Sequence, residues 1–306
     1  MAGIRLLFPL LFLLLLFSCH SSNPYEGIEY IKDSNGYTYF LNNPDSQSLI
    51  IYIDGSGYHS VLGIQKGNKK WSVTTLANPL SSFFKENYNI LLPEKLTYEP
   101  GRDYADANRF LPQDTVEDMG QSYALKIDNF LQDKQYEYIV LLGTSEGGAL
   151  LPYIYAHIEN RKLIDRLVIW SGGGLSQLKE FQILGDSPVP MPKEFRDQYR
   201  TVDTLVKLIE ADPEATNLFY LGRPYIHWKS YFKYEPIEYL KEINIPVLFL
   251  HGELDWSTPV ESTRFVEESH LSKLFDFIYY PQMEHGPSSY EELEKIMGDI
   301  DKWLNN

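Results

Sequence analysis

Three loops of this chain carry the residues most able to do chemistry: a serine, an aspartate and a histidine. Ser145 lies in a Gly-Thr-Ser-Glu-Gly segment that directly follows the apolar run 136–142. A serine hydroxyl becomes a useful nucleophile when a sharp turn exposes it beside a base and beside donors for an oxyanion. Gly143 and Gly147, which flank the serine at two positions before and after it, let the backbone make such a turn. The segment predicts a nucleophilic serine between a strand and a helix.

An acid and a base follow in later loops. Asp255 comes shortly after the apolar run 246–250, and His285 lies between the alternating run 275–280 and an amphipathic helical pattern. Each has a structural alternative, because aspartate is a common turn former and a loop histidine can simply pack. His251, close to Asp255, is expected to be structural at the end of a strand.

The order serine, then aspartate, then histidine is that of α/β-hydrolases and differs from the orders of the chymotrypsin and subtilisin architectures. On these three motifs, the chain from about Tyr30 to its C-terminus resembles the α/β-hydrolase family of serine esterases, lipases and peptidases. The resemblance implies that Ser145 is the nucleophile, His285 the base and Asp255 the acid that orients the base. A degenerate hydrolase fold without an intact triad is the alternative.

The oxyanion donors can be placed by the same resemblance. An Asp-Gly-Ser-Gly segment beginning at Asp54 follows the apolar run 49–53, where the family has an HGGG or HG-x segment. One donor is then the backbone N–H of Glu146, and the other is that of Ser56 or Gly57. Asp54 stands in place of the usual histidine, which leaves open which residue donates. The alternative is an ordinary glycine turn.

Composition limits the class of partner. The chain has 306 residues, 43% of them hydrophobic, which is enough to bury a large core. Its formal net charge of −15 argues against a nucleic-acid partner, since phosphate backbones attract Lys and Arg. There is no clustered Cys/His set and no phosphate-cradling glycine loop, so neither a metal nor an organic cofactor is expected. The oligomeric state is left open.

The N-terminus predicts a bacterial lipoprotein signal peptide over residues 1–18. Arg5 precedes an apolar run over 6–17, which is short for a membrane span and suited to a secretory signal. The run ends in Leu-Phe-Ser-Cys, which resembles a lipobox, and Cys19 is the single cysteine. We expect acylation of Cys19 and a tether over 19–24 that anchors the protein in the cell envelope, with the outer membrane favoured. An ordinary secretory signal is the alternative.

The rest of the chain alternates between strand and helix patterns, which indicates an α/β fold with a mostly parallel central sheet flanked by helices. Strands are expected over 25–32, 37–41, 49–53, 89–92, 136–142, 167–170, 246–250 and 275–280, and helices around 83–84 and over 115–131, 149–158 and 289–304. Pro152 predicts a kink or a break in its helix.

The alternation lapses over 175–244, where we expect a helical cap inserted after the sixth strand. The hydrolase core would then comprise 25–174 and 245–306. Residues 217–240 are rich in aromatic side chains. They could form the cap's own small core or an apolar roof over the substrate, and both interpretations stay open.

Three functions fit this pattern. The first is a serine hydrolase that cleaves a small or medium carboxylic ester at the envelope. The second is a serine aminopeptidase or peptidase of the same fold acting on a short peptide. For it, Glu146, Glu194, Glu210 or Glu214 could bind a substrate amine, or could simply be solvated surface. The third is a non-catalytic envelope binding protein on a hydrolase scaffold.

Overall fold

The computed structural model describes residues 27–66, 70–73, 75–100 and 102–306. The expected signal peptide, Cys19 and the tether lie outside these residues. The strands of the main sheet are β1 (Glu29–Asp33), β2 (Gly36–Leu41), β3 (Ser48–Ile53), β6 (Asn89–Pro93), β7 (Tyr138–Thr144), β8 (Arg166–Trp170), β11 (Val247–Gly252) and β12 (Phe275–Tyr280).

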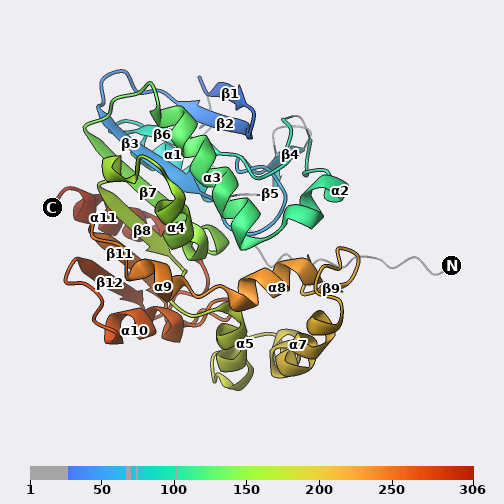
Figure 1. The fold of residues 1–306 in the computed structure, drawn as a ribbon. Helices are drawn as coiled ribbons and strands as arrows, with labels where there is room; N and C mark the ends of the chain where they lie inside the picture. The colour runs from blue at the N-terminus through green and yellow to red at the C-terminus, as the bar shows by residue number, and fades with distance from the viewer. Residues whose placement is uncertain (1–26, 67–69, 74, 101) are drawn as a thin grey trace.

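Within the described chain, this sheet has eight strands in the order β1-β2-β6-β3-β7-β8-β11-β12 (Figure 1). The strands from β6 to β12 in that order run parallel, whereas β1 pairs antiparallel with β2, and β2 with β6. The predicted fold class, an α/β fold with a mostly parallel sheet, is confirmed.

The apolar strands are covered on both faces, as continuous hydrophobic runs predict. In β3, Leu49, Ile51 and Ile53 belong to the core on one face, while Ile50 and Tyr52 belong to the core on the other. The first face packs against α3 (Val116–Leu131), α4 (Glu146–His157), α9 (Pro236–Leu240) and α10 (Val260–Glu268). The second packs against α1 (Ala77–Phe84) and α11 (Tyr290–Leu304).

The helix α4 corrects one expectation. It begins at Glu146, three residues earlier than expected, and continues through Pro152 to His157, so the break is not observed. The helix is buried along most of its length, with Leu151 and Ile154 fully inaccessible. Packing on several sides holds it together despite the hydrogen bond that proline cannot donate.

Short elements complete the described chain. They are β4 (Ile64–Lys66), β5 (Lys70–Val73), α2 (Ala107–Phe110), and 3-10 turns over Leu111–Gln113 and Arg161–Leu163. Among the described residues, no helix is both long and apolar enough to cross a membrane.

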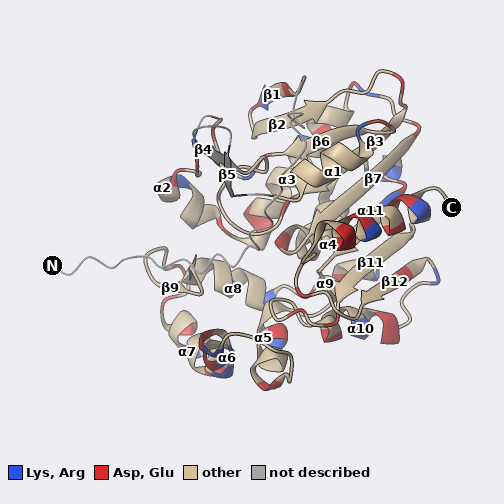
Figure 2. Ribbon diagram, turned by 180° about the vertical axis from the view of Figure 1, so that it is seen from behind, with Lys and Arg blue, Asp and Glu red and all other residues tan. Residues whose placement is uncertain are grey.

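Residues 175–244 leave the sheet after β8, its sixth strand in chain order. They form α5 (Gln177–Asp186), α6 (Lys193–Arg200), α7 (Val202–Ala211), the two short strands β9 (Phe219–Tyr220) and β10 (Arg223–Pro224), α8 (Tyr225–Lys233) and α9. The helix α8 contacts α3 of the core as well as α5 and α7 (Figure 1). Figure 2 shows charged positions on α5 and α6, whereas α8 is mostly uncharged.

The aromatic residues of this segment divide between two cores. Trp228 and Phe232 pack with the segment's own cluster, which also holds residues of α5, α6 and α7. Tyr231 and Tyr234 instead belong to the core on the α3 and α4 face of the sheet. The interpretation as a small internal core therefore holds for the first pair, and the cap over a substrate stays a prediction.

Candidate active site

Ser145 sits on a strained turn at the carboxyl end of β7. Its φ of 55° and ψ of −123° lie where few side chains are tolerated, and α4 begins at the next residue. Both flanking glycines are required by close backbone contacts. A Cβ atom on Gly143 would lie 2.5 Å from the oxygen of Gly147, and one on Gly147 would lie 2.4 Å from the oxygen of Ile53. The turn exposes the serine, as the motif predicts.

The structure brings the three predicted residues into one hydrogen-bonded chain. Nε2 of His285 lies 2.8 Å from Oγ of Ser145, and Nδ1 of His285 lies 2.8 Å from Oδ2 of Asp255. The residues come from the loops after β12, β7 and β11, which meet because parallel strands end at the same edge of the sheet. With Nδ1–H donated to Asp255, Nε2 is left to accept the proton of the Ser145 hydroxyl.

The loop that carries Asp255 holds its carboxylate in place. Oδ1 of Asp255 accepts hydrogen bonds from the backbone N–H groups of Ser257 and Thr258, at 2.8 and 2.9 Å. Burial alone would raise the pKa of Asp255. The charge of His285, together with hydrogen bonds from His285 and His251, instead holds that pKa well below its usual range. Although burial opposes it, Asp255 in turn raises the pKa of His285 above its ordinary value.

His251 lies behind the acid rather than beside the serine. Its Nδ1 is 2.7 Å from Oγ1 of Thr263, and its Nε2 is 2.9 Å from the oxygen of Thr258. Nε2 also lies 3.4 Å from Oδ2 of Asp255. The ring thus links the end of β11 to the acid loop and is positioned to support it.

The loop after β3 lies directly against the serine. A Cβ atom on Gly55 would be 3.2 Å from Cβ and 3.6 Å from Oγ of Ser145. Gly57 has a φ of 107°, which favours glycine. Within the described chain, no hydrogen bond uses the backbone N–H of Ser56, Gly57 or Glu146. These three donors remain available for a charged oxygen on Ser145.

The carboxylate of Glu146 forms an ion pair within the protein. Its Oε2 accepts a hydrogen bond from Nη2 of Arg223 at 2.8 Å, while Nη1 of Arg223 donates to Oδ2 of Asp114 at 2.9 Å. Oδ1 of Asp114 lies 3.0 Å from Nδ1 of His227. Glu146 is therefore paired with a buried arginine and is not a free carboxylate for a substrate amine.

The other glutamates considered for an amine are also poorly placed. Glu194 and Glu210 are exposed, and Glu214 forms an ion pair with Lys229. None of them has a hydrogen bond or ion pair to the serine, the histidine or the acid among the described residues. Among the described residues, no group of three or more His, Cys, Asp or Glu side chains is arranged to hold a metal ion.

A second buried carboxyl lies close to the acid. Glu180 on α5 is 5% exposed, and its Oε1 accepts a hydrogen bond from Oγ of Ser262 at 2.7 Å. Burial raises the pKa of Glu180 to about 8, against the effect of the Ser262 hydrogen bond, and nearby Asp255 adds to the rise. Glu180 is therefore largely neutral at pH 7 and adds little charge beside Asp255.

This carboxyl predicts a loss of stability as the pH rises. Its pKa is 4.5 ordinarily and about 8 in the folded protein, so the folded state binds the extra proton between these values. The stabilisation is complete below pH 4.5 and is lost as the pH rises through 8, by at most about 1.4 kcal/mol per pH unit. We expect Glu180→Gln to remove this slope in urea unfolding at graded pH. Glu261→Gln, on the exposed side of α10, is the control; equal slopes for Glu180→Gln and wild type would contradict the assignment.

The chain is similar to known proteins in its structure. No protein-family model and no curated protein sequence matches the chain. Solved structures do match: an esterase of Pyrococcus furiosus is 14% identical with a TM-score of 0.58, over 94% of this chain and 95% of that protein. The mouse alpha/beta hydrolase domain-containing protein 10 is 17% identical with a TM-score of 0.54, over 91% of this chain and 98% of that one.

An acylaminoacyl peptidase of Pyrococcus horikoshii is also similar. It is 14% identical with a TM-score of 0.59, over 91% of this chain, which corresponds to 41% of the peptidase. These likenesses agree on the α/β-hydrolase fold, which the chain therefore has.

Proposed function

We propose that this protein is a serine hydrolase that cleaves a carboxylic ester through an acyl-enzyme. The observation that carries the proposal is the hydrogen-bonded chain from Ser145 through His285 to Asp255, with both bonds at 2.8 Å. Its nucleophile lies on a strained turn and its acid is buried. Such an arrangement activates a serine hydroxyl, and the similarity to esterases supports the choice of reaction.

The first half of the reaction acylates the serine. Oγ of Ser145 attacks the ester carbonyl while Nε2 of His285 takes the hydroxyl proton, and Asp255 stabilises the resulting imidazolium. The carbonyl oxygen becomes an oxyanion that the N–H groups of Glu146 and of Ser56 or Gly57 would hold. The tetrahedral intermediate then collapses, and the alcohol leaves with the proton from His285. Water, deprotonated by the same histidine, cleaves the acyl-enzyme and restores the serine.

An ester is favoured over the substrate of an aminopeptidase, because none of the four glutamates considered for binding a substrate amine is free beside Ser145. Glu146 is paired with Arg223 and Glu214 with Lys229, while Glu194 and Glu210 face solvent. A peptidase needs a counter-charge for the free amine of its substrate only if it acts at the N-terminus. The similar acylaminoacyl peptidase keeps an amide substrate as the second candidate.

Labelling with a fluorophosphonate probe tests the proposal. The probe should form an adduct on the tryptic peptide that contains Ser145, as mass spectrometry would show. An unlabelled protein, or an adduct on another serine, would overturn the assignment. A panel of p-nitrophenyl esters of graded chain length, run beside aminoacyl-naphthylamides, then decides the substrate class. Faster turnover of the amides would favour the peptidase.

We further propose that the protein acts at the bacterial cell envelope, anchored by lipid on Cys19. The support is the sequence alone: an apolar run over 6–17, a lipobox-like segment and the single cysteine at its end. Expressed with its leader in a bacterium, the full chain should fractionate with membranes and Cys19→Ser should be released from them. Retention of the Cys19→Ser variant on membranes would refute the lipid anchor.

A further inference from the structure

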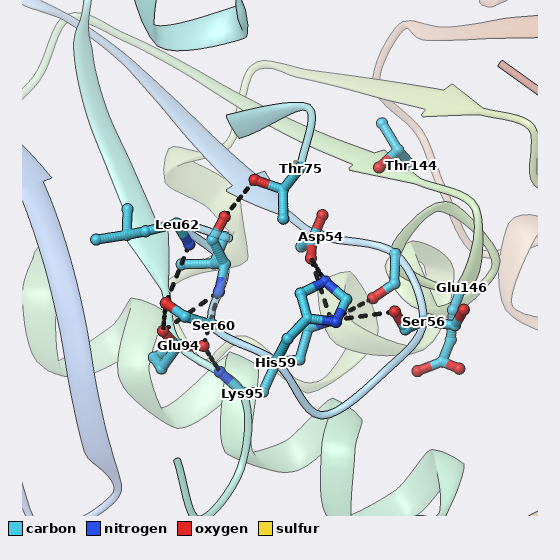
Figure 3. Close-up of polar contacts among 12 residues, drawn as sticks. Asp54, Ser56, His59, Ser60, Leu62, Thr75, Glu94, Lys95, Thr144 and Glu146 are labelled. Carbon is cyan, nitrogen blue, oxygen red and sulfur yellow. Dashed lines mark hydrogen bonds and ion pairs between the residues drawn. The ribbon is translucent and has the colours of Figure 1, made fainter. Parts of the chain in front are cut away.

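A buried lysine binds the main-chain carbonyl groups of the loop that follows β3. Lys95, at 2% exposure, lies two residues beyond the end of β6. Its Nζ atom donates to the carbonyl oxygens of Gly55 and Ser56 at 2.7 and 3.3 Å, and lies 3.1 Å from Oδ2 of Asp54 (Figure 3). An ammonium group has three protons, and these three acceptors can use all of them.

The lysine is the cation of this cluster. The ring of His59 lies close by, with its Nε2 3.7 Å from Oδ2 of Asp54. Burial and the neighbouring charge of Lys95 hold the pKa of His59 well below its ordinary value, so the ring is neutral. Asp54 and Lys95 thus form the buried ion pair under the loop.

These contacts determine how two peptide groups are oriented. In a trans peptide, the C=O of one residue and the N–H of the next point in opposite directions. With the carbonyls of Gly55 and Ser56 turned to Lys95, the N–H groups of Ser56 and Gly57 point away from it. In Figure 3, Ser56 lies between Lys95 and Glu146. A cation on a carbonyl oxygen also polarises the peptide and makes its N–H a stronger donor.

The same cluster is tied to the nucleophile turn. Tyr52 donates its hydroxyl to Oδ1 of Asp54 at 3.0 Å, and the same hydroxyl lies 2.9 Å from Oγ1 of Thr144. Thr144 directly precedes Ser145. A polar chain therefore runs from the nucleophile turn through Tyr52 and Asp54 to Lys95, and from there to the loop.

We propose that Lys95, held by Asp54, is a positioning residue that aims the N–H groups of Ser56 and Gly57 at the oxyanion formed on Ser145. The proposal rests on the proposed function, because it concerns the same reaction. The proposal also gives a role to Asp54, which occupies the position where α/β-hydrolases usually have a histidine. The Asp54 carboxylate holds the ammonium group of Lys95, and Lys95 orients the two N–H donors.

Lys95→Met tests this, since methionine keeps most of the length and removes the charge. We expect kcat for a p-nitrophenyl ester, per fluorophosphonate-titratable site, to fall roughly 10- to 100-fold with KM within about threefold of wild type. Deleting an oxyanion donor outright costs about 10²–10³-fold, and misaiming it should cost less. The inhibition constant of a trifluoromethyl ketone, which forms an oxyanion on the serine, should rise by a similar factor.

A double variant separates an effect on the reaction from a loss of folding. Lys95→Met leaves Asp54 buried without its cation, so Asp54→Asn/Lys95→Met removes both charges together. We expect this double variant to regain thermal stability but not kcat. Wild-type kcat per titrated site in a folded double variant would overturn the positioning role while leaving the hydrolase intact. Absence of turnover in the wild type would overturn both proposals.

Arg166→Met is the matched control. The Arg166 side chain also donates to a main-chain carbonyl, that of Trp303, but it lies at the opposite, amino end of β8. We expect it to lower thermal stability without changing kcat or the inhibition constant of the ketone. A loss of kcat in Arg166→Met as large as that in Lys95→Met would mean that the effect is a general consequence of instability, against the proposal.

Discussion

Ser145→Ala should lower kcat for ester hydrolysis by about 10⁶-fold while the protein stays folded. The substitution removes only Oγ, the atom 2.8 Å from Nε2 of His285, so no covalent intermediate can form. The φ of 55° that Ser145 already adopts is kept by alanine at a similar cost. Steady-state hydrolysis of the best p-nitrophenyl ester measures the effect. Ser269→Ala, at the exposed end of α10, is the matched control.

Variants of His285 and Asp255 test whether these residues act together with Ser145. Ser145→Ala and His285→Ala act on one step, so their combination should be about as inactive as either alone. Asp255→Asn should lower kcat by about 10⁴-fold, because an amide favours the wrong tautomer of His285. Losses that multiply in the double variant, or near-wild-type activity in Ser145→Ala, would show that these residues do not work as a unit.

The parts of this site that sequence could predict are those with a local signal. Unbroken apolar runs such as the one ending at Ile53 marked strands that are buried on both faces. Once several such strands are parallel, their carboxyl ends must meet, and the loops bearing Ser145, Asp255 and His285 meet with them. The glycines at 143 and 147 also carry a local signal, since the turn leaves no room for a side chain.

The charged residues around the site could not be predicted, because their partners are remote in the chain. Arg223 reaches Asp114 across 109 positions and Glu146 across 77. Lys95 binds the carbonyl of Gly55 across 40 positions. Nothing in the surrounding sequence marks either residue as buried, since lysine and arginine usually lie on the surface. Only the packing of α8 and β10 against the core reveals why Glu146 is not free for a substrate.

Arg223→Met should reduce the free energy of unfolding by about 3–5 kcal/mol, the largest stability effect that we expect. Arg223 is 8% exposed, and its guanidinium forms two ion pairs, with Asp114 and with Glu146, at 2.9 and 2.8 Å. Although burial opposes it, the charges of Arg223 and His227 hold the pKa of Asp114 well below its usual range. Removing the arginine leaves two buried carboxylates without their shared cation. Urea unfolding at pH 7 measures the loss.

Two further variants test whether the stability loss in Arg223→Met arises because its ion pairs are buried. Arg264→Met breaks the pair with Glu253, whose side chains are 42% and 35% exposed, and should cost about 1 kcal/mol or less. Combining Arg223→Met with Asp114→Asn and Glu146→Gln removes the arginine together with both carboxylates. This triple variant should regain most of the stability, because the cost comes from buried carboxylates that have lost their shared cation. A small loss in Arg223→Met alone would mean that water reaches this cluster.

The same arginine should also affect the reaction, because the proposed mechanism uses the backbone N–H of Glu146 as an oxyanion donor. When Arg223 is absent, the Glu146 carboxylate is an unpaired negative charge one residue from the serine that must carry an oxyanion. Like charges in a poorly solvated site repel strongly, so kcat per titrated site should fall about tenfold in Arg223→Met. Adding Glu146→Gln should return kcat toward wild type, since the amide removes the charge and keeps the N–H. If kcat does not recover, Arg223 acts by holding β10 and α8 against the core rather than by neutralising Glu146.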